Sequence, residues 1–123
     1  MNQNTQFLRH TIAETDVQSL AETYRTPVYV YDAQVIRQRC RDLSSWDTVR
    51  FAQKACSNLA ILNLIRQEGV LVDAVSTGEI HRAIKAGYHP HTSESKPNSL
   101  PQEHPIVYTA DIFDRESLDA VTE

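Results

Sequence analysis

Three charged side chains interrupt or follow two short apolar runs in the middle of the sequence. Lys54 comes two residues after the run Val49–Ala52, Asp73 lies inside the run Val70–Val75, and Glu79 comes just past that run. The carboxyl ends of neighbouring parallel strands meet at one edge of a sheet, where α/β folds place their sites. If both runs are parallel strands, we expect these three side chains to lie at the same edge.

A lysine at a strand end can act as a nucleophile toward a carbonyl group, for example by forming a Schiff base. It must first lose its proton, which burial favours and a nearby carboxylate opposes. Asp73 and Glu79 would therefore position Lys54 more than activate it. A structural alternative stays open at this point. Lys54 is then a strand-end charge paired with Asp73, and Glu79 is an acid in the capping box that Ser76 opens.

Other common site chemistries find little support in the sequence. Of the five histidines, His89, His91 and His104 lie in one proline-rich segment, where a polar surface loop is the simpler interpretation than a zinc site. No G-x-S-x-G motif and no glycine-rich phosphate loop is present. We therefore expect no metal site.

The composition describes an ordinary globular chain. It has 123 residues, 41% hydrophobic and 23% charged, with a formal net charge of −4. Acidic and basic residues are interspersed, so the sequence shows no basic patch of the kind that binds nucleic acid. No apolar run is long enough to span a membrane. The N-terminus lacks the apolar core of a signal peptide, so we expect a cytoplasmic protein in which Cys40 and Cys56 are free thiols.

Apolar spacing and capping residues predict a series of helices and strands. Helices are expected after Asp16, Asp32, Ser57 or Asn58, Ser76 and Asp114, and Gly69 and Gly87 are expected to end the two central ones. The inward residues expected for those two helices are Leu59, Leu62, Ile65, Ile80, Ala83 and Ile84. Strands are expected at Val28–Tyr31, Val49–Ala52, Val70–Val75 and Ile106–Tyr108, and a proline-rich surface loop at 88–105.

From Thr48 onward the expected order is β-α-β-α-β-α. Such alternation indicates parallel strands joined by right-handed crossovers, with strands buried on both faces. A doubly wound sheet and part of a (β/α)8 barrel both fit, and periodicity does not separate them. A complete barrel needs about 250 residues, so only three βα units fit here.

Three stretches carry a resemblance to a known family. FAQKACSN (51–58), LAILNLIRQEGVLVDAVSTGEIHRAIKAGY (59–88) and VYTADIFDRESL (107–118) together resemble bacterial diaminopimelate decarboxylases. TPVYVYDAQVIRQRC (26–40) also fits the way that family enters its barrel. The likeness runs from about Thr26 to the C-terminus, with the loop 88–105 as the exception. The ordered combination of these motifs is far more specific than a lone lysine motif.

The resemblance implies an α/β fold made of the first three βα units of an alanine-racemase-like, pyridoxal-phosphate-binding (β/α)8 barrel. A helix and a strand precede it, so we expect a lead-in segment at 1–47 and an incomplete barrel at 48–123. Lys54 matches the lysine that binds pyridoxal 5'-phosphate, and Asp73 and Glu79 match acidic positions near it. The implied reaction converts meso-diaminopimelate to L-lysine and CO2, in a homodimer.

The resemblance also marks what this chain lacks. The later barrel strands, the glycine-rich phosphate loop, the sandwich domain and the residues from a partner subunit have no counterpart in the sequence. We therefore expect an N-terminal piece that is inactive alone. Two alternatives stay open: a non-catalytic pyridoxal-phosphate-binding barrel, and a pseudoenzyme fragment that associates with an intact decarboxylase. Alanine racemases share the fold but differ after their lysine.

Overall fold

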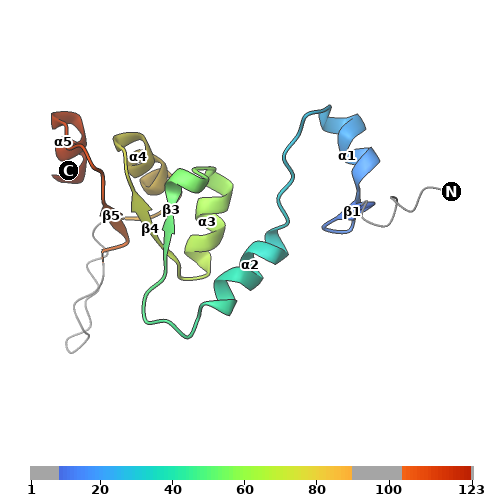
Figure 1. Cartoon of the computed structure of the whole chain (residues 1–123), viewed down its shortest axis with the longest axis horizontal. Coiled ribbons are helices and arrows are strands. Elements are labelled where there is room, and N and C mark those ends of the chain that lie inside the picture. Colours follow the sequence, from blue (N-terminus) through green and yellow to red (C-terminus); the bar gives the residue numbers. More distant parts are fainter. Residues whose placement is uncertain (1–8, 90–103, 123) are drawn as a thin grey trace.

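The computed structural model describes residues 9–89 and 104–122, which form a small parallel sheet with helices and a separate N-terminal part (Figure 1). The elements in chain order are β1 (Thr11–Ile12), β2 (Thr15–Asp16), α1 (Val17–Tyr24), α2 (Ala33–Asp42), β3 (Arg50–Ala52), the 3₁₀ helix η2 (Gln53–Ala55), α3 (Leu59–Gln67), β4 (Leu71–Ala74), α4 (Thr77–Lys85), β5 (Ile106–Tyr108) and α5 (Arg115–Thr122). A β1–β2 hairpin and helix α1 lie apart from the sheet, and α2 connects them to it.

The sheet confirms the parallel alternation expected from the sequence. Its strand order is β3-β4-β5, and both pairs are parallel. Asp73 at the centre pairs in register with Ala52 on one side and with Val107 on the other. The carboxyl ends of the three strands therefore lie at one edge of the sheet.

One face of the sheet is packed against α3 and α4. The buried cluster consists of Leu62, Ile65, Val70, Val72, Ala83, Ala86 and Tyr88. Along β4, Val72 and Ala74 are fully buried, whereas Leu71 and Asp73 are partly exposed. Because side chains alternate between the two faces of a strand, Leu71 and Asp73 lie on the face away from these helices. Within the described residues these helices cover one face of the sheet, which differs from the two covered faces that the apolar strands indicated and agrees with the open face expected of three βα units alone.

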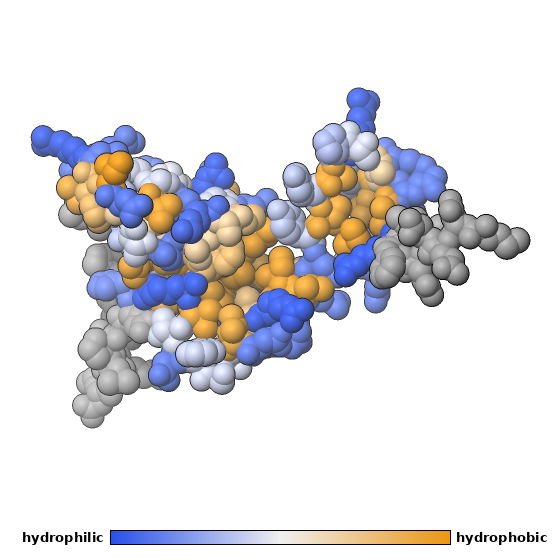
Figure 2. Space-filling model, in the orientation of Figure 1, coloured by the Kyte–Doolittle hydropathy of each residue, from blue (hydrophilic) through white to orange (hydrophobic). Residues whose placement is uncertain are grey.

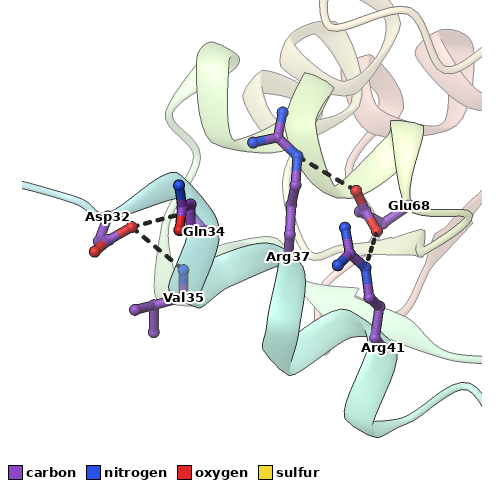
Figure 3. Close-up of polar contacts among 6 residues, drawn as sticks. All are labelled: Asp32, Gln34, Val35, Arg37, Arg41 and Glu68. Carbon is purple, nitrogen blue, oxygen red and sulfur yellow. Dashed lines mark hydrogen bonds and ion pairs between the residues drawn. The ribbon is translucent and has the colours of Figure 1, made fainter. Parts of the chain in front are cut away.

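Local capping signals locate the helix starts well. Asp16 Oδ1 accepts a hydrogen bond from the Ser19 amide, and Asp32 Oδ1 accepts bonds from the Gln34 and Val35 amides (Figure 3). Asn58, and not Ser57, caps α3, while Ser76 and Asp114 cap the last two helices. Gly69 and Gly87 follow α3 and α4 with φ of +81° and +97°, as expected for αL stops.

Helix α2 is attached to the body of the protein by apolar and ionic contacts. Ile36 and Cys40 pack against the buried cluster. Glu68, the residue directly after α3, forms ion pairs with Arg37 Nε and Arg41 Nε, both at 3.3 Å (Figure 3). These contacts hold α2 across the carboxyl end of α3.

The segment Val28–Tyr31 is not the strand that its β-branched and aromatic residues predicted. Tyr29 is 89% exposed, and the described residues place no strand beside the segment to share backbone hydrogen bonds. A strand needs such a partner, whatever its composition.

At the end of the segment the Cys56 thiol beside Tyr31 raises the pKa of that phenol.

The prediction of an inward-pointing side chain was also wrong for two residues. Leu59 is 37% exposed and Ile84 is 36% exposed, because each lies beside the buried stripe of its helix and not within it. Figure 2 shows apolar surface both near α1 and on the body that contains the sheet.

The proline-rich segment is described only at its two ends. Tyr88 is buried at 2% exposure, so a surface loop beginning at residue 88 was wrong at that position, and residues 90–103 lie outside the described ranges. No helix in the described part of the chain combines the length and apolar character that a membrane crossing requires.

Candidate functional site

Lys54 lies in the short 3₁₀ helix η2 that directly follows β3, and its side chain is exposed. Hydrogen bonds brace this turn from both sides. The Cys56 amide and the Ser57 hydroxyl both donate to the Gln53 carbonyl, at 2.9 and 3.2 Å. Arg82 Nη1 of α4 donates to the Ser57 carbonyl at 3.2 Å. The lysine therefore extends from a turn whose backbone is fixed at the carboxyl edge of the sheet.

The residue before the lysine is a buried amide that the sequence interpretation missed. Gln53 is only 1% exposed, and neither its Oε1 nor its Nε2 has a hydrogen-bond partner among the residues that the structure describes. Gln53 continues the two-residue alternation of Val49 and Phe51, which both pack against the core. That alternation was the signal that could have placed Gln53 inside.

Asp73 lies on the sheet face away from α3 and α4, beside Ala52 and two residues before the end of its apolar run. Its Oδ1 accepts a hydrogen bond of 2.6 Å from the Thr109 hydroxyl. No ion pair joins Asp73 to Lys54 within the described ranges. The alternative in which these two residues form a pair was therefore wrong. The reason is that Asp73 is held by Thr109, the residue directly after β5, while Lys54 lies on a separate turn after β3.

Glu79 acts on the backbone of its own turn. Its Oε2 accepts a 2.8 Å hydrogen bond from the Val75 amide, and its own amide donates to Ser76 Oγ at 3.3 Å. In an ordinary capping box the glutamate carboxylate accepts a hydrogen bond from the amide of the capping residue. Here the donor is the amide one residue earlier, so the capping box is shifted by one residue. The carboxylate of Glu79 thus fixes the connection between β4 and α4, just past Asp73.

The structure brings Lys54, Asp73 and Glu79 to one edge of the sheet without direct contacts among them in the described residues. An exposed primary amine on a braced turn can attack a carbonyl carbon, and a fixed carboxylate nearby can orient a cation. The described residues contain no group of metal-binding side chains, and His91 lies outside them.

The parallel βα units thus present an amine and a carboxylate at the carboxyl edge of the sheet, the edge at which α/β folds place their sites. The chain belongs to the family of pyridoxal-dependent decarboxylases, by a match of residues 33–122 to the model of their pyridoxal binding domain.

Particular relatives are diaminopimelate decarboxylases. The chain is 46% identical to the enzyme of Escherichia coli K12 over 93% of its own length and 27% of the relative, and 48% identical to the enzyme of Streptomyces coelicolor over 84% and 21%. A crystal structure of diaminopimelate decarboxylase aligns with a TM-score of 0.72 and 48% identity, over 84% of this chain and 22% of that one. The chain thus spans about a quarter of the length of these relatives.

Proposed function

We propose that this chain carries the cofactor lysine of a pyridoxal-phosphate-dependent decarboxylase that converts meso-diaminopimelate to L-lysine and CO2. The observation that supports it most is the placement of Lys54. An exposed amine on a braced turn at the carboxyl edge of the sheet occurs in a chain 46% identical to the diaminopimelate decarboxylase of Escherichia coli.

The residues present fit such a cofactor. Pyridoxal phosphate presents an aldehyde, for which a primary amine is the matching nucleophile, and no described residue occupies the Lys54 amine in an ion pair. When bound, the cofactor supplies an electron-withdrawing ring that stabilises the electron pair left by a departing carboxylate.

Each of the three side chains then has a role that follows from its surroundings. Lys54 would bind the cofactor through its Nζ and, when released from it, would hold or move a proton at that nitrogen. Asp73, fixed by Thr109, would orient positive charge beside Lys54. Glu79 would keep the β4–α4 connection in place through the Val75 amide, as a positioning residue of the cofactor site.

The fold proposal follows from the same likeness. The three βα units would be the first three of a (β/α)8 barrel, with residues 1–47 as a lead-in segment and 48–123 as the barrel portion. The sheet face that carries Asp73 would be the barrel interior. Because that face is uncovered in the described residues, we propose that the chain alone has negligible decarboxylase activity and that the working enzyme is a homodimer of longer chains.

The exposed apolar segment Val28–Tyr31 favours a second candidate, in which this chain is a pyridoxal-phosphate-binding or pseudoenzyme fragment that associates with an intact decarboxylase. Co-purification of tagged chain with the full-length Escherichia coli enzyme would support it. Separate elution of the two proteins at micromolar concentration would exclude it.

The cofactor lysine can be tested by chemical trapping. The purified chain is mixed with pyridoxal phosphate, reduced with borohydride and mapped by mass spectrometry. We expect the label mainly on Lys54 and little on Lys85, an exposed lysine at the end of α4. Lys54→Arg is the matched control and should remove the preferred label. Equal labelling of both lysines in the wild type would contradict the proposal.

A further inference from the structure

Thr109 is attached to two successive residues of the neighbouring strand. Its amide donates to the Ala74 carbonyl at 2.9 Å, which continues the ladder between β4 and β5 past the last residue of β5. Its hydroxyl donates to Asp73 Oδ1 at 2.6 Å. A hydroxyl donating to a carboxylate at this distance is in the range of strong, charge-assisted hydrogen bonds. The backbone bond fixes Thr109, and the hydroxyl then fixes the carboxylate.

The carboxylate fixed in this way lies next to the lysine turn. Asp73 pairs in register with Ala52, which is two residues before Lys54, and lies on the sheet face opposite α3 and α4. The bond from Thr109 is the one polar contact that the described residues give the Asp73 side chain. It occupies Oδ1 and leaves the acceptor positions of Oδ2 open. Without it, the aspartate could rotate freely among its rotamers.

We propose that Thr109 is a positioning residue for the lysine site: its hydroxyl fixes the Asp73 carboxylate at the sheet edge that also carries Lys54, and leaves Oδ2 free to interact with the lysine nitrogen. This inference rests on the proposed function of Lys54. The Thr109 hydroxyl carries no charge, so its effect on the lysine site comes from orienting the Asp73 carboxylate. When the side chains around the lysine nitrogen are already ordered, binding the cofactor there costs less conformational entropy than binding it among mobile side chains.

The test compares variants of the full chain in the trapping experiment with pyridoxal phosphate, using the ratio of label on Lys54 to label on Lys85. Thr109→Val keeps the β-branched shape and removes the hydroxyl, and we expect the ratio to fall roughly fivefold. Thr109→Ser keeps the hydroxyl and should stay within about twofold of wild type. Thr77→Val is the matched control, because it removes a threonine hydroxyl bond between α4 and α5, to Ser117 at 3.0 Å.

A second set of variants, made in the Asp73→Asn protein, distinguishes a purely structural role of Thr109 from a positioning role. In Asp73→Asn the charge is gone, so adding Thr109→Val should change the ratio by less than about 1.5-fold if Thr109 acts through the carboxylate. Urea unfolding of each variant checks that equal fractions of the proteins are folded under the labelling conditions. Should Thr109→Val not fold, Thr109→Ala against Thr109→Ser makes the same comparison.

The outcomes separate this inference from the proposed function. No preference for Lys54 in the wild type would overturn both. A preference in the wild type that Thr109→Val leaves unchanged would overturn the role of Thr109 alone. A fall in the ratio that is equally large with Thr77→Val, or that persists in Asp73→Asn, would also overturn it, because the loss would then be structural.

Discussion

Gln53 shows how a single side chain can oppose the stability of the fold that contains it. It is buried beside the lysine turn, and its amide atoms have no hydrogen-bond partners among the described residues. Burying a polar group without a partner costs about 1–3 kcal/mol.

Replacing Gln53 with methionine should therefore stabilise the chain. Methionine has a similar shape and no polar atom to leave unpaired, so we expect the free energy of unfolding to rise by about 1 kcal/mol. Urea unfolding followed by circular dichroism measures it. Gln67→Met, at an exposed position at the end of α3, should change little. A loss of stability in Gln53→Met would show that the amide is hydrogen-bonded after all.

Tyr88 is a buried residue whose titration affects stability at alkaline pH. Its hydroxyl donates to the Val70 carbonyl at 2.8 Å, and burial raises the pKa of this phenol. A raised pKa means that the folded state favours the neutral form. The corresponding stability is fully present below the unfolded phenol pKa of about 10, and is lost as the pH rises above it.

Above pH 10 the free energy of unfolding should fall, with a contribution from Tyr88 of up to about 1.4 kcal/mol per pH unit. Tyr88→Phe should be less stable at pH 7, because the Val70 carbonyl loses its donor, but should show a shallower decline at alkaline pH. Denaturation between pH 8 and about 11 compares the two slopes. Parallel curves for the two proteins would mean that Tyr88 does not titrate on unfolding.

At the scale of elements, α2 depends on a small number of contacts. Two arginines of α2 share the carboxylate of Glu68, whose side chain is only 18% exposed. Exposed ion pairs contribute about 0.2–1 kcal/mol each, and salt weakens them. Because α2 also buries Ile36 and Cys40 against the core, the ion pairs supplement an apolar contact.

Glu68→Ala should loosen α2 more than the rest of the fold. We expect faster amide hydrogen exchange in α2, with exchange in β4 unchanged, and a smaller difference from wild type in 1 M salt than at about 50 mM. Asp42→Ala is the matched control, since it breaks the Arg39 pair inside α2 itself. Equal acceleration by both variants would show that Glu68 does not hold α2 in place.

Elements with local signals could be predicted from the sequence, and those that depend on distant partners could not. The capping residues Asp32 and Ser76 marked helix starts because their bonds reach only two or three residues along the chain. The β1–β2 hairpin was missed because its turn places Ala13 and Glu14 at φ of +49° and +62°, where glycine or asparagine is the usual signal.

The candidate site divides in the same way. The edge position of Lys54 followed from counting residues after an apolar run. The bond from Thr109 to Asp73 joins residues 36 apart, so no local pattern indicated it. The expected bond from the Glu79 amide to Ser76 was confirmed, but the Glu79 carboxylate accepts from the Val75 amide and not from that of Ser76, and the place of Glu79 in the cofactor site stays a prediction.

At the scale of the whole molecule, the part of the chain that the structure describes has several large apolar side chains at its surface. Tyr29, Trp46, Ile112 and Phe113 are all more than half exposed, at 89%, 70%, 79% and 56%. Exposed sheet edges and apolar side chains favour association with another chain or with further parts of a longer one. A site on the uncovered sheet face is also open to water, which weakens every electrostatic interaction in it.

The isolated chain should therefore turn over meso-diaminopimelate at a negligible rate even when saturated with pyridoxal phosphate. Release of CO2 from labelled substrate measures it, with Lys54→Arg as the background. A rate within about tenfold of the full-length Escherichia coli enzyme would show that the uncovered face does not limit catalysis.

The most direct measurement places this chain in a complete enzyme. The aligned segment of the Escherichia coli diaminopimelate decarboxylase is replaced by this chain, and CO2 release from meso-diaminopimelate is compared between the chimera and its Lys54→Arg variant. We expect an active chimera and a rate at least about a hundredfold lower in the variant, since arginine can neither bind the aldehyde nor move the proton. A folded chimera that is inactive, or that keeps its rate with arginine at position 54, would contradict the assignment of Lys54 as the cofactor lysine.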